Sequence, residues 1–136
     1  MTAAPGPGID ALVDAMPFTR LCGVEVTAAQ AEAVTGLVEW APERCTAGGV
    51  MHGGVLMALA DSLGALCAVL NLPPRARTST IESKTNFFRA VRSGAARGTS
   101  RPLHVGRSTI VVQTDIVDDG GRRVAQTTQT QSVLTS

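Results

Sequence analysis

One carboxylate, Asp61, lies in the middle of the most apolar stretch of the chain, residues 55–70, and no other charged residue occurs between Arg44 and Arg75. An ionised carboxylate among apolar residues costs free energy unless it is paired or hydrogen-bonded. In a cleft, such a group can serve as a general base or a nucleophile, which is the functional interpretation of Asp61. Two structural interpretations stay open: a buried carboxylate held by hydroxyl groups such as that of Ser62, and simple exposure at a gap in the fold.

The tripeptide His52-Gly53-Gly54 precedes this stretch and supplies a second candidate. None of the usual capping residues, Ser, Thr, Asp or Asn, stands at the helix start, so we expect free backbone amides there. Free amides at a helix N-terminus bind anions and oxyanions, and glycines let a substrate carbonyl approach the backbone. A tight turn at the glycines and a structural role for the histidine are the alternatives.

Gly53 and Asp61 of one helix lie too far apart to act on the same carbonyl group. Eight residues of α-helix span about 12 Å, whereas a catalytic hydrogen bond needs about 3 Å. In two antiparallel copies of the helix, the N-terminus of one copy would face the carboxylate of the other. Catalysis by these residues therefore predicts a site between subunits and a protein that is at least a homodimer.

Gly54–Leu70 is the one long helix that the sequence predicts. Leucines recur at spacings of three and four and form a stripe that should pack on a sheet: Leu56, Leu59, Leu63, Leu66 and Leu70. A second stripe combines Asp61 with small residues: Gly54, Ala58, Ala65 and Ala68. Small residues let a second helix, another backbone or a ligand come close, so this face is the candidate binding face.

The rest of the chain predicts mostly strands. A short helix is expected over Ile9–Met16, ended by Pro17, and a loop over Pro42–Met51. Six segments have strand character: Leu21–Val26, Ala33–Trp40, Thr78–Phe88, Ala95–Arg101, Val105–Val117 and Arg122–Leu134. The sequence DDGG at 118–121 predicts the hairpin turn before the last strand. One helix on a mostly antiparallel, six-stranded sheet gives an α+β fold class.

The hydrophobic pattern does not indicate what covers two parts of this sheet. The segment TTQTQS at 127–132 is polar on both faces; its threonines favour a strand, but the sequence does not indicate what covers it. The sheet is also larger than one helix can cover. We therefore expect a partner subunit on the remaining surface.

Length and composition narrow the class of protein. The chain has 136 residues, which suits a flexible Pro/Gly arm over 1–8 followed by one domain over 9–136. A net charge of +1 without a basic block argues against nucleic acid as a partner. Three widely spaced cysteines without a Cys/His cluster indicate free thiols in a reducing cytoplasm and no metal site. No signal-peptide pattern is present, and residues 55–70 are short for a membrane span.

Three runs of sequence resemble the hotdog-fold acyl-CoA thioesterases of the PaaI-like group: HGGVLMALAD (His52–Asp61), TNFFRA (Thr85–Ala90) and HVGRSTIVVQTDIVDDGGRRVAQ (His104–Gln126). The resemblance covers residues 20 to 134 in family order. It implies a long central helix wrapped by a curved antiparallel sheet, and dimers with their sheets joined edge to edge, often paired into homotetramers. The implied activity is that of a hydrolase that converts an acyl-CoA thioester to a free acid and CoA, with no metal or other cofactor.

The resemblance also implies roles for individual residues. The position of Asp61 holds the base or nucleophile. The backbone amide at the position of Gly53 polarises the thioester carbonyl from the other subunit. The position of His52 helps to shape the acyl and thioester pocket, and Gly54 belongs to the same substrate-binding helix start.

One departure from the family pattern concerns the residues six and seven positions before His52. Similar enzymes often place Asn or Gln there, whereas this chain has Thr46 and Cys45. Thr46 is a candidate substrate-binding residue, although its hydroxyl group would hydrogen-bond more weakly. Ser79 lies near a position where some relatives use a hydroxyl group to orient water.

The phosphates of CoA require positive charge at the mouth of the pocket, and Arg suits phosphate geometry. The candidates are Arg89, Arg92 and Arg107, each with an ordinary surface charge as the alternative. Two other functions stay open: a non-catalytic acyl-CoA or acyl-carrier binding module, and a hotdog hydratase that would pair His52 with Asp61. The sequence does not indicate which acyl group is bound.

Overall fold

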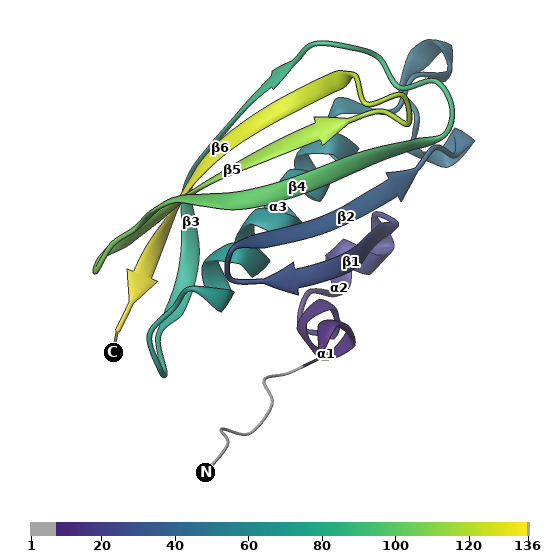
Figure 1. The fold of residues 1–136 in the computed structure, drawn as a ribbon. Coiled ribbons are helices and arrows are strands. Elements are labelled where there is room, and N and C mark those ends of the chain that lie inside the picture. Colours follow the sequence, from purple (N-terminus) through teal and green to yellow (C-terminus); the bar gives the residue numbers. More distant parts are fainter. Residues whose placement is uncertain (1–7, 136) are drawn as a thin grey trace.

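The computed structural model describes residues 8–135, in which a long helix, α3 (Gly53–Leu70), lies across one face of a six-stranded antiparallel sheet (Figure 1). The strands follow the order β1-β2-β4-β5-β6-β3 across the sheet. Their bounds are β1 Val24–Gln30, β2 Ala33–Glu39, β3 Arg77–Phe87, β4 Ala95–Val105, β5 Thr109–Val117 and β6 Arg123–Leu134. The predicted α+β class and strand number are confirmed. The predicted arm over residues 1–8 lies, except for Gly8, outside the described residues.

The leucine stripe of α3 forms the core, as its spacing predicts. Leu59 and Leu63 are fully buried, and burial of each contributes about 1.5–3 kcal/mol. The sheet comes close to the helix where β2 and β4 pair Gly36 with Gly98, because a Cβ on either glycine would lie 2.8 Å from a methyl group of Leu63. By length and composition α3 could cross a membrane, but nine of its 18 residues are buried here, so it is the core helix of this fold.

The second stripe of α3 differs in part from the prediction. Ala68 is fully buried, whereas Met57 is 44% exposed and shares the open face with Asp61. The chain after the helix folds back, and Leu72 and Ala76 pack against the cluster that contains Ala68. The predicted stripe of small residues therefore ends before Ala68, and the open face of α3 also carries one long apolar side chain.

The N-terminal segment contains two helices where one was expected: α1 (Ile9–Asp14) and α2 (Pro17–Leu21). Pro17 begins the second helix because the first helical position needs no N–H donor. The residues of α2 and the turn at Gly23, with φ of +79°, displace the start of the first strand to Val24. The strand predicted over Leu21–Val26 was therefore wrong at its beginning.

Strand β4 extends further than the sequence predicts. It continues past Pro102 to Val105 because a bulge between Pro102 and His104 removes the need for a ladder hydrogen bond at the proline. The following strand begins only at Thr109. The single strand predicted over Val105–Val117 therefore begins with residues that belong to the end of β4 and to a turn.

The predicted hairpin turn between β5 and β6 is confirmed. Oδ1 of Asp118 accepts hydrogen bonds from the backbone amides of Gly120 and Arg122, at 3.0 and 2.9 Å. These donors, the Arg122 amide foremost, hold the pKa of Asp118 below its ordinary value. The carboxylate therefore stabilises the turn that aligns β6 with β5.

The TTQTQS segment belongs to β6, and its buried side chains form a polar layer with the neighbouring strand β3. Thr127, Gln129 and Gln131 are each 1% exposed. Gln131 uses both ends of its amide, accepting from Thr78 at 3.0 Å and donating to Thr80 at 2.7 Å. Buried polar groups of this kind need such partners. The amide of Gln129, in contrast, reaches α3.

Candidate active site

His52 caps α3, whereas the sequence predicts an uncapped start. Its Nδ1 atom accepts a hydrogen bond from the amide of Gly54 at 2.7 Å. The carbonyl oxygen of His52 accepts from the amides of Val55 and Leu56 at 2.9 and 3.4 Å. Histidine is not among the usual capping residues, but a neutral imidazole nitrogen is a competent acceptor. An argument from residue types alone therefore misses this cap.

The backbone amide of Gly53 is the one amide of the first turn that this cap leaves without an acceptor. No residue in the described part of the chain accepts a hydrogen bond from it. The first amides of a helix have no intrahelical acceptor and lie at the positive end of the helix dipole. The cap thus singles out Gly53 as the donor that is available to a substrate oxygen.

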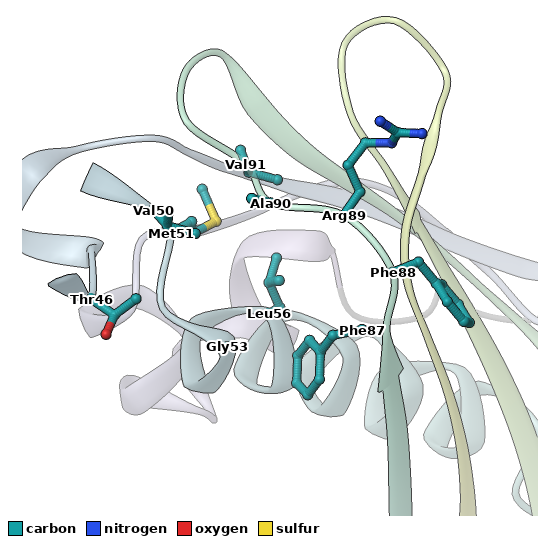
Figure 2. Close-up of a pocket in the computed structure, with 10 residues that line it drawn as sticks. All are labelled: Thr46, Val50, Met51, Gly53, Leu56, Phe87, Phe88, Arg89, Ala90 and Val91. Atoms are coloured by element: carbon teal, nitrogen blue, oxygen red, sulfur yellow. The ribbon is translucent and has the colours of Figure 1, made fainter. Parts of the chain in front are cut away.

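Gly53 lines a pocket of about 340 Å³ where the start of α3 meets the end of β3 (Figure 2). Figure 2 shows the ring of Phe87 beside the start of α3, while the side chain of Arg89 extends away from this helix. A Cβ on Gly53 would lie 3.3 Å from the Phe87 ring, so the glycine keeps the space between the helix start and this ring open. The other walls are largely apolar and come from Val50, Met51, Leu56, Phe88, Ala90 and Val91. An apolar pocket with one free amide can hold an acyl group and polarise its carbonyl.

Asp61 is exposed on the open face of α3 and has a buried partner on β6. Nε2 of Gln129 donates a hydrogen bond to Oδ1 of Asp61 at 3.3 Å. Ser62 is buried and shares a 2.9 Å hydrogen bond with Thr19 instead. The structural interpretation of a buried carboxylate held by hydroxyl groups is therefore wrong, whereas the exposure of Asp61 agrees with the second structural interpretation. Asp61 is a solvent-accessible carboxylate that one fixed amide holds in place.

Within one chain, Gly53 and Asp61 stay apart, as their spacing predicts. The helix begins at Gly53 and reaches Asp61 about 12 Å further along its axis. Each chain therefore presents two candidate half-sites: the free amide in the pocket, and the carboxylate on the open helix face.

The sequence profile of the thioesterase superfamily matches residues 48–125, which include both half-sites. The chain belongs to the thioesterase superfamily. A thioesterase from Haemophilus influenzae has the same fold, with a TM-score of 0.89 at 25% identity over 96% of this chain and 93% of that chain. The hotdog fold expected from the resemblance is therefore confirmed.

Curated relatives in this thioesterase superfamily match part of the chain. The 1,4-dihydroxy-2-naphthoyl-CoA hydrolase of Escherichia coli is 33% identical over 86 residues, 63% of either chain. The proofreading thioesterase EntH of Cronobacter sakazakii is also 33% identical over 86 residues, again 63% of either chain. The first curated relatives are matched over only 59–63% of their own length.

The structure of this thioesterase-superfamily chain brings only some of the other predicted site residues to the pocket. Thr46 and Arg89 line it. Ser79 does not, because it lies eight residues before Phe87 on β3, about 26 Å along an extended strand. Arg107 does not either, because it lies in the turn after β4, at the far end of that strand from the pocket. The roles of Ser79 and Arg107 stay predictions.

Three further candidates have partners within the chain. The amide of Gly54 is occupied by His52, so it is not a free substrate donor. The thiol of Cys45 donates to the carbonyl of Ala41 at 3.3 Å. Arg92 donates to the carbonyl of Gly48 at 3.2 Å. These contacts stabilise the loop between β2 and α3, next to the pocket.

Sequence reasoning missed two residues of this region, Phe87 and Gln129. Phe87 belongs to the TNFFRA run, but nothing in its spacing indicates that it lies over the helix start. Gln129 alternates with Gln131, which predicts a shared face, yet only the packing of β6 against α3 shows which of the two meets Asp61.

Proposed function

We propose that this protein hydrolyses acyl-CoA thioesters to a free acid and CoA. The observation that carries the proposal is the free amide of Gly53, which lines an apolar pocket at the N-terminus of α3. Membership of the thioesterase superfamily and a CoA hydrolase among the relatives support the same chemistry.

In the proposed reaction, the Gly53 amide donates to the thioester carbonyl oxygen and stabilises the charge that develops there. Asp61 either takes a proton from the attacking water or attacks the carbonyl carbon to form a mixed anhydride that water then hydrolyses. In both routes the C–S bond breaks, the sulfur takes up one proton, and the acyl carbon gains oxygen from water. These groups supply what hydrolysis needs, so the proposal includes no metal or redox cofactor, and CoA enters only with the substrate.

The two half-sites come from different subunits in this proposal. Strand β3 supports it, because β3 is an edge of the described sheet, in which it pairs with β6 alone. Nine of its 11 residues are exposed, and Ile81 is 64% exposed. Unpaired edge strands readily pair with another chain. A second copy lying along β3 with its helix antiparallel would bring its own Gly53 towards Asp61. We propose a homodimer as the minimum, with dimers paired into a homotetramer.

The substrate lies, in this proposal, with its acyl group in the pocket beside Phe87 and its CoA phosphates near Arg89. Arg89 is exposed at the pocket, so its guanidinium group can approach a phosphate without being desolvated first. Thr46 and His52 border the same helix start. A cytoplasmic location fits a core helix that the sheet covers and three cysteines without disulfides.

The test is release of free thiol from a panel of short, medium, long and aryl acyl-CoAs, with wild type, Asp61→Asn and Asp61→Ala. We expect hydrolysis by the wild type and a loss of about 10²–10⁴-fold in kcat in both variants, as for removal of a positioned base. Asp10→Asn, an exposed carboxylate on α1, is the matched control and should keep full activity.

Two results would reject this function. Turnover of Asp61→Ala close to that of wild type across the panel would remove Asp61 from the reaction. Tight binding of acyl-CoA by the wild type without thiol release would identify a binding module instead.

A further inference from the structure

We propose that Gln129 is a positioning residue for Asp61, an inference that rests on the proposed function. The two residues are 68 positions apart, and Nε2 of Gln129 lies 3.3 Å from Oδ1 of Asp61. Gln129 is 1% exposed, whereas Asp61 is exposed. The contact thus joins a side chain fixed in the interior to a carboxylate at the surface.

The backbone of Gln129 is fixed by the sheet, and its amide lies against α3. Its strand β6 lies inside the sheet, where Gln129 is paired with Val112 of β5 and with Ser83 of β3. On the helix side, a Cβ at Gly64 would overlap Oε1 of Gln129. Glycine at position 64, one turn after Asp61, therefore provides the space that the amide occupies. The amide therefore lies directly against the backbone of α3 at Gly64.

Packing alone does not explain a glutamine at position 129. Its Oε1 atom is buried and has no hydrogen-bond partner among the described residues. A buried carbonyl without a partner costs free energy that an apolar side chain of the same size would not. The nearby Gln131 shows the contrasting case, since both ends of its amide are bonded to threonines of β3. Within residues 8–135, the hydrogen bond to Asp61 is the one side-chain hydrogen bond that Gln129 makes.

This hydrogen bond defines what the carboxylate can do. It occupies Oδ1 and fixes the rotation of the group, so that Oδ2 is left to meet water or the thioester carbon in one orientation. Orientation of a reacting group affects the chemical step, and small displacements can cost large factors in rate. Loss of the donor should therefore lower kcat and leave KM almost unchanged.

The experiment compares Gln129→Met with Gln131→Met, using the acyl-CoA of the panel that wild type hydrolyses fastest. Met keeps the size of the side chain and removes the donor. We expect Gln129→Met to lower kcat about 10- to 100-fold with KM changed less than about twofold. Gln131→Met should lose thermal stability, since it removes the hydrogen-bond partner of Thr80 and one of the two acceptors of Thr78, and keep kcat within about twofold.

Gly64→Ala is the second variant, which perturbs Gln129 without changing it. The added Cβ displaces the amide, so kcat should fall, although alanine favours the helix. If Gly64→Ala keeps the unfolding temperature of the wild type but has a lower kcat, the loss of activity comes from the position of the amide and not from reduced stability. If Gln129→Met does not fold, the kcat of Gly64→Ala decides in its place.

Asp61→Asn, measured alongside, separates the two claims. If Asp61→Asn is inactive but Gln129→Met keeps the wild-type kcat, the positioning role is overturned and the proposed function stands. If Gln129→Met does not fold, the kcat of Gly64→Ala is used for the same comparison. Activity retained by Asp61→Asn overturns both.

Discussion

The Nδ1 atom of His52 lies 2.7 Å from the amide nitrogen of Gly54 and accepts its proton. This cap and the carbonyl of the same residue satisfy three amides of the first turn of α3. The Gly53 amide is the one that they leave free, at the entrance of the apolar pocket. A single histidine thus determines which backbone amide of the first turn is left free.

Replacement of the cap should reduce stability in a graded way. His52→Ala removes the acceptor and should lower the free energy of unfolding by about 1 kcal/mol, whereas His52→Asn offers another capping oxygen and should cost less. Urea denaturation of wild type and both variants measures the difference. Equal stability of wild type and His52→Ala would show that the imidazole does not act as a cap.

Removal of the backbone N–H of Gly53 should reduce activity more than the addition of a side chain at the same position. Gly53→Pro deletes the N–H at the first helical position, where proline is tolerated, and His52 already has the extended backbone that precedes proline, with φ of −62° and ψ of 134°. Loss of an oxyanion donor typically lowers kcat about 10²–10³-fold.

Gly53→Ala is the matched control for this test. It keeps the amide and adds a Cβ at 3.3 Å from the Phe87 ring, which can move slightly. Its kcat should fall much less than that of Gly53→Pro. Equal kcat in both variants, measured by thiol release, would mean that the steric change rather than the amide matters.

Loss of the charge at Arg89 should weaken binding of CoA and leave the chemical step intact. Arg89→Ala should raise KM for an acyl-CoA about tenfold, because a charge-assisted contact to phosphate is lost. An N-acetylcysteamine thioester of the same acid has no phosphates, so its KM should not change. An increase for both substrates would place Arg89 at the acyl group instead of the phosphates.

Stability should fall in alkaline solution because of Cys67. Burial raises the pKa of this thiol to about 11 from 9.0. Between these values the folded state keeps a proton that the unfolded chain releases, so the free energy of unfolding decreases as the pH rises from 9 to 11, by up to about 2–3 kcal/mol. Denaturation curves of wild type and Cys67→Ala over this range measure the effect. A decrease of the same size in Cys67→Ala would assign it to other groups.

The helix, its leucine face and most strands follow from the sequence because periodicity reports directly on burial. Leu59 and Leu63 face the sheet as their spacing predicts, and β2 lies within one residue of its predicted bounds. The predicted bounds of helices and strands are wrong where one residue is compatible with two local structures. Pro17 can end a helix or begin one, and Pro102 interrupts a strand unless a bulge accommodates it.

The candidate site was predictable in part for the same reason. Asp61 and Gly53 stand out by type and by spacing within one helix. The cap by His52 depends on a side-chain orientation, and the contact of Gln129 with Asp61 joins residues 68 positions apart through the packing of β6 on α3. The first relationship is local but depends on a rotamer, and the second lies outside any local pattern of the sequence.

The central claim, that Asp61 of one subunit acts with Gly53 of its neighbour, is tested most directly by combining two inactive variants. Asp61→Ala and Gly53→Pro are co-expressed with different affinity tags, and oligomers that carry both tags are isolated by two successive purifications. Each dimer that combines the two variants has one of its two shared sites intact, so we expect thiol release well above that of either variant, up to about half of the wild-type value. Activity no higher than that of either variant alone would contradict a shared site.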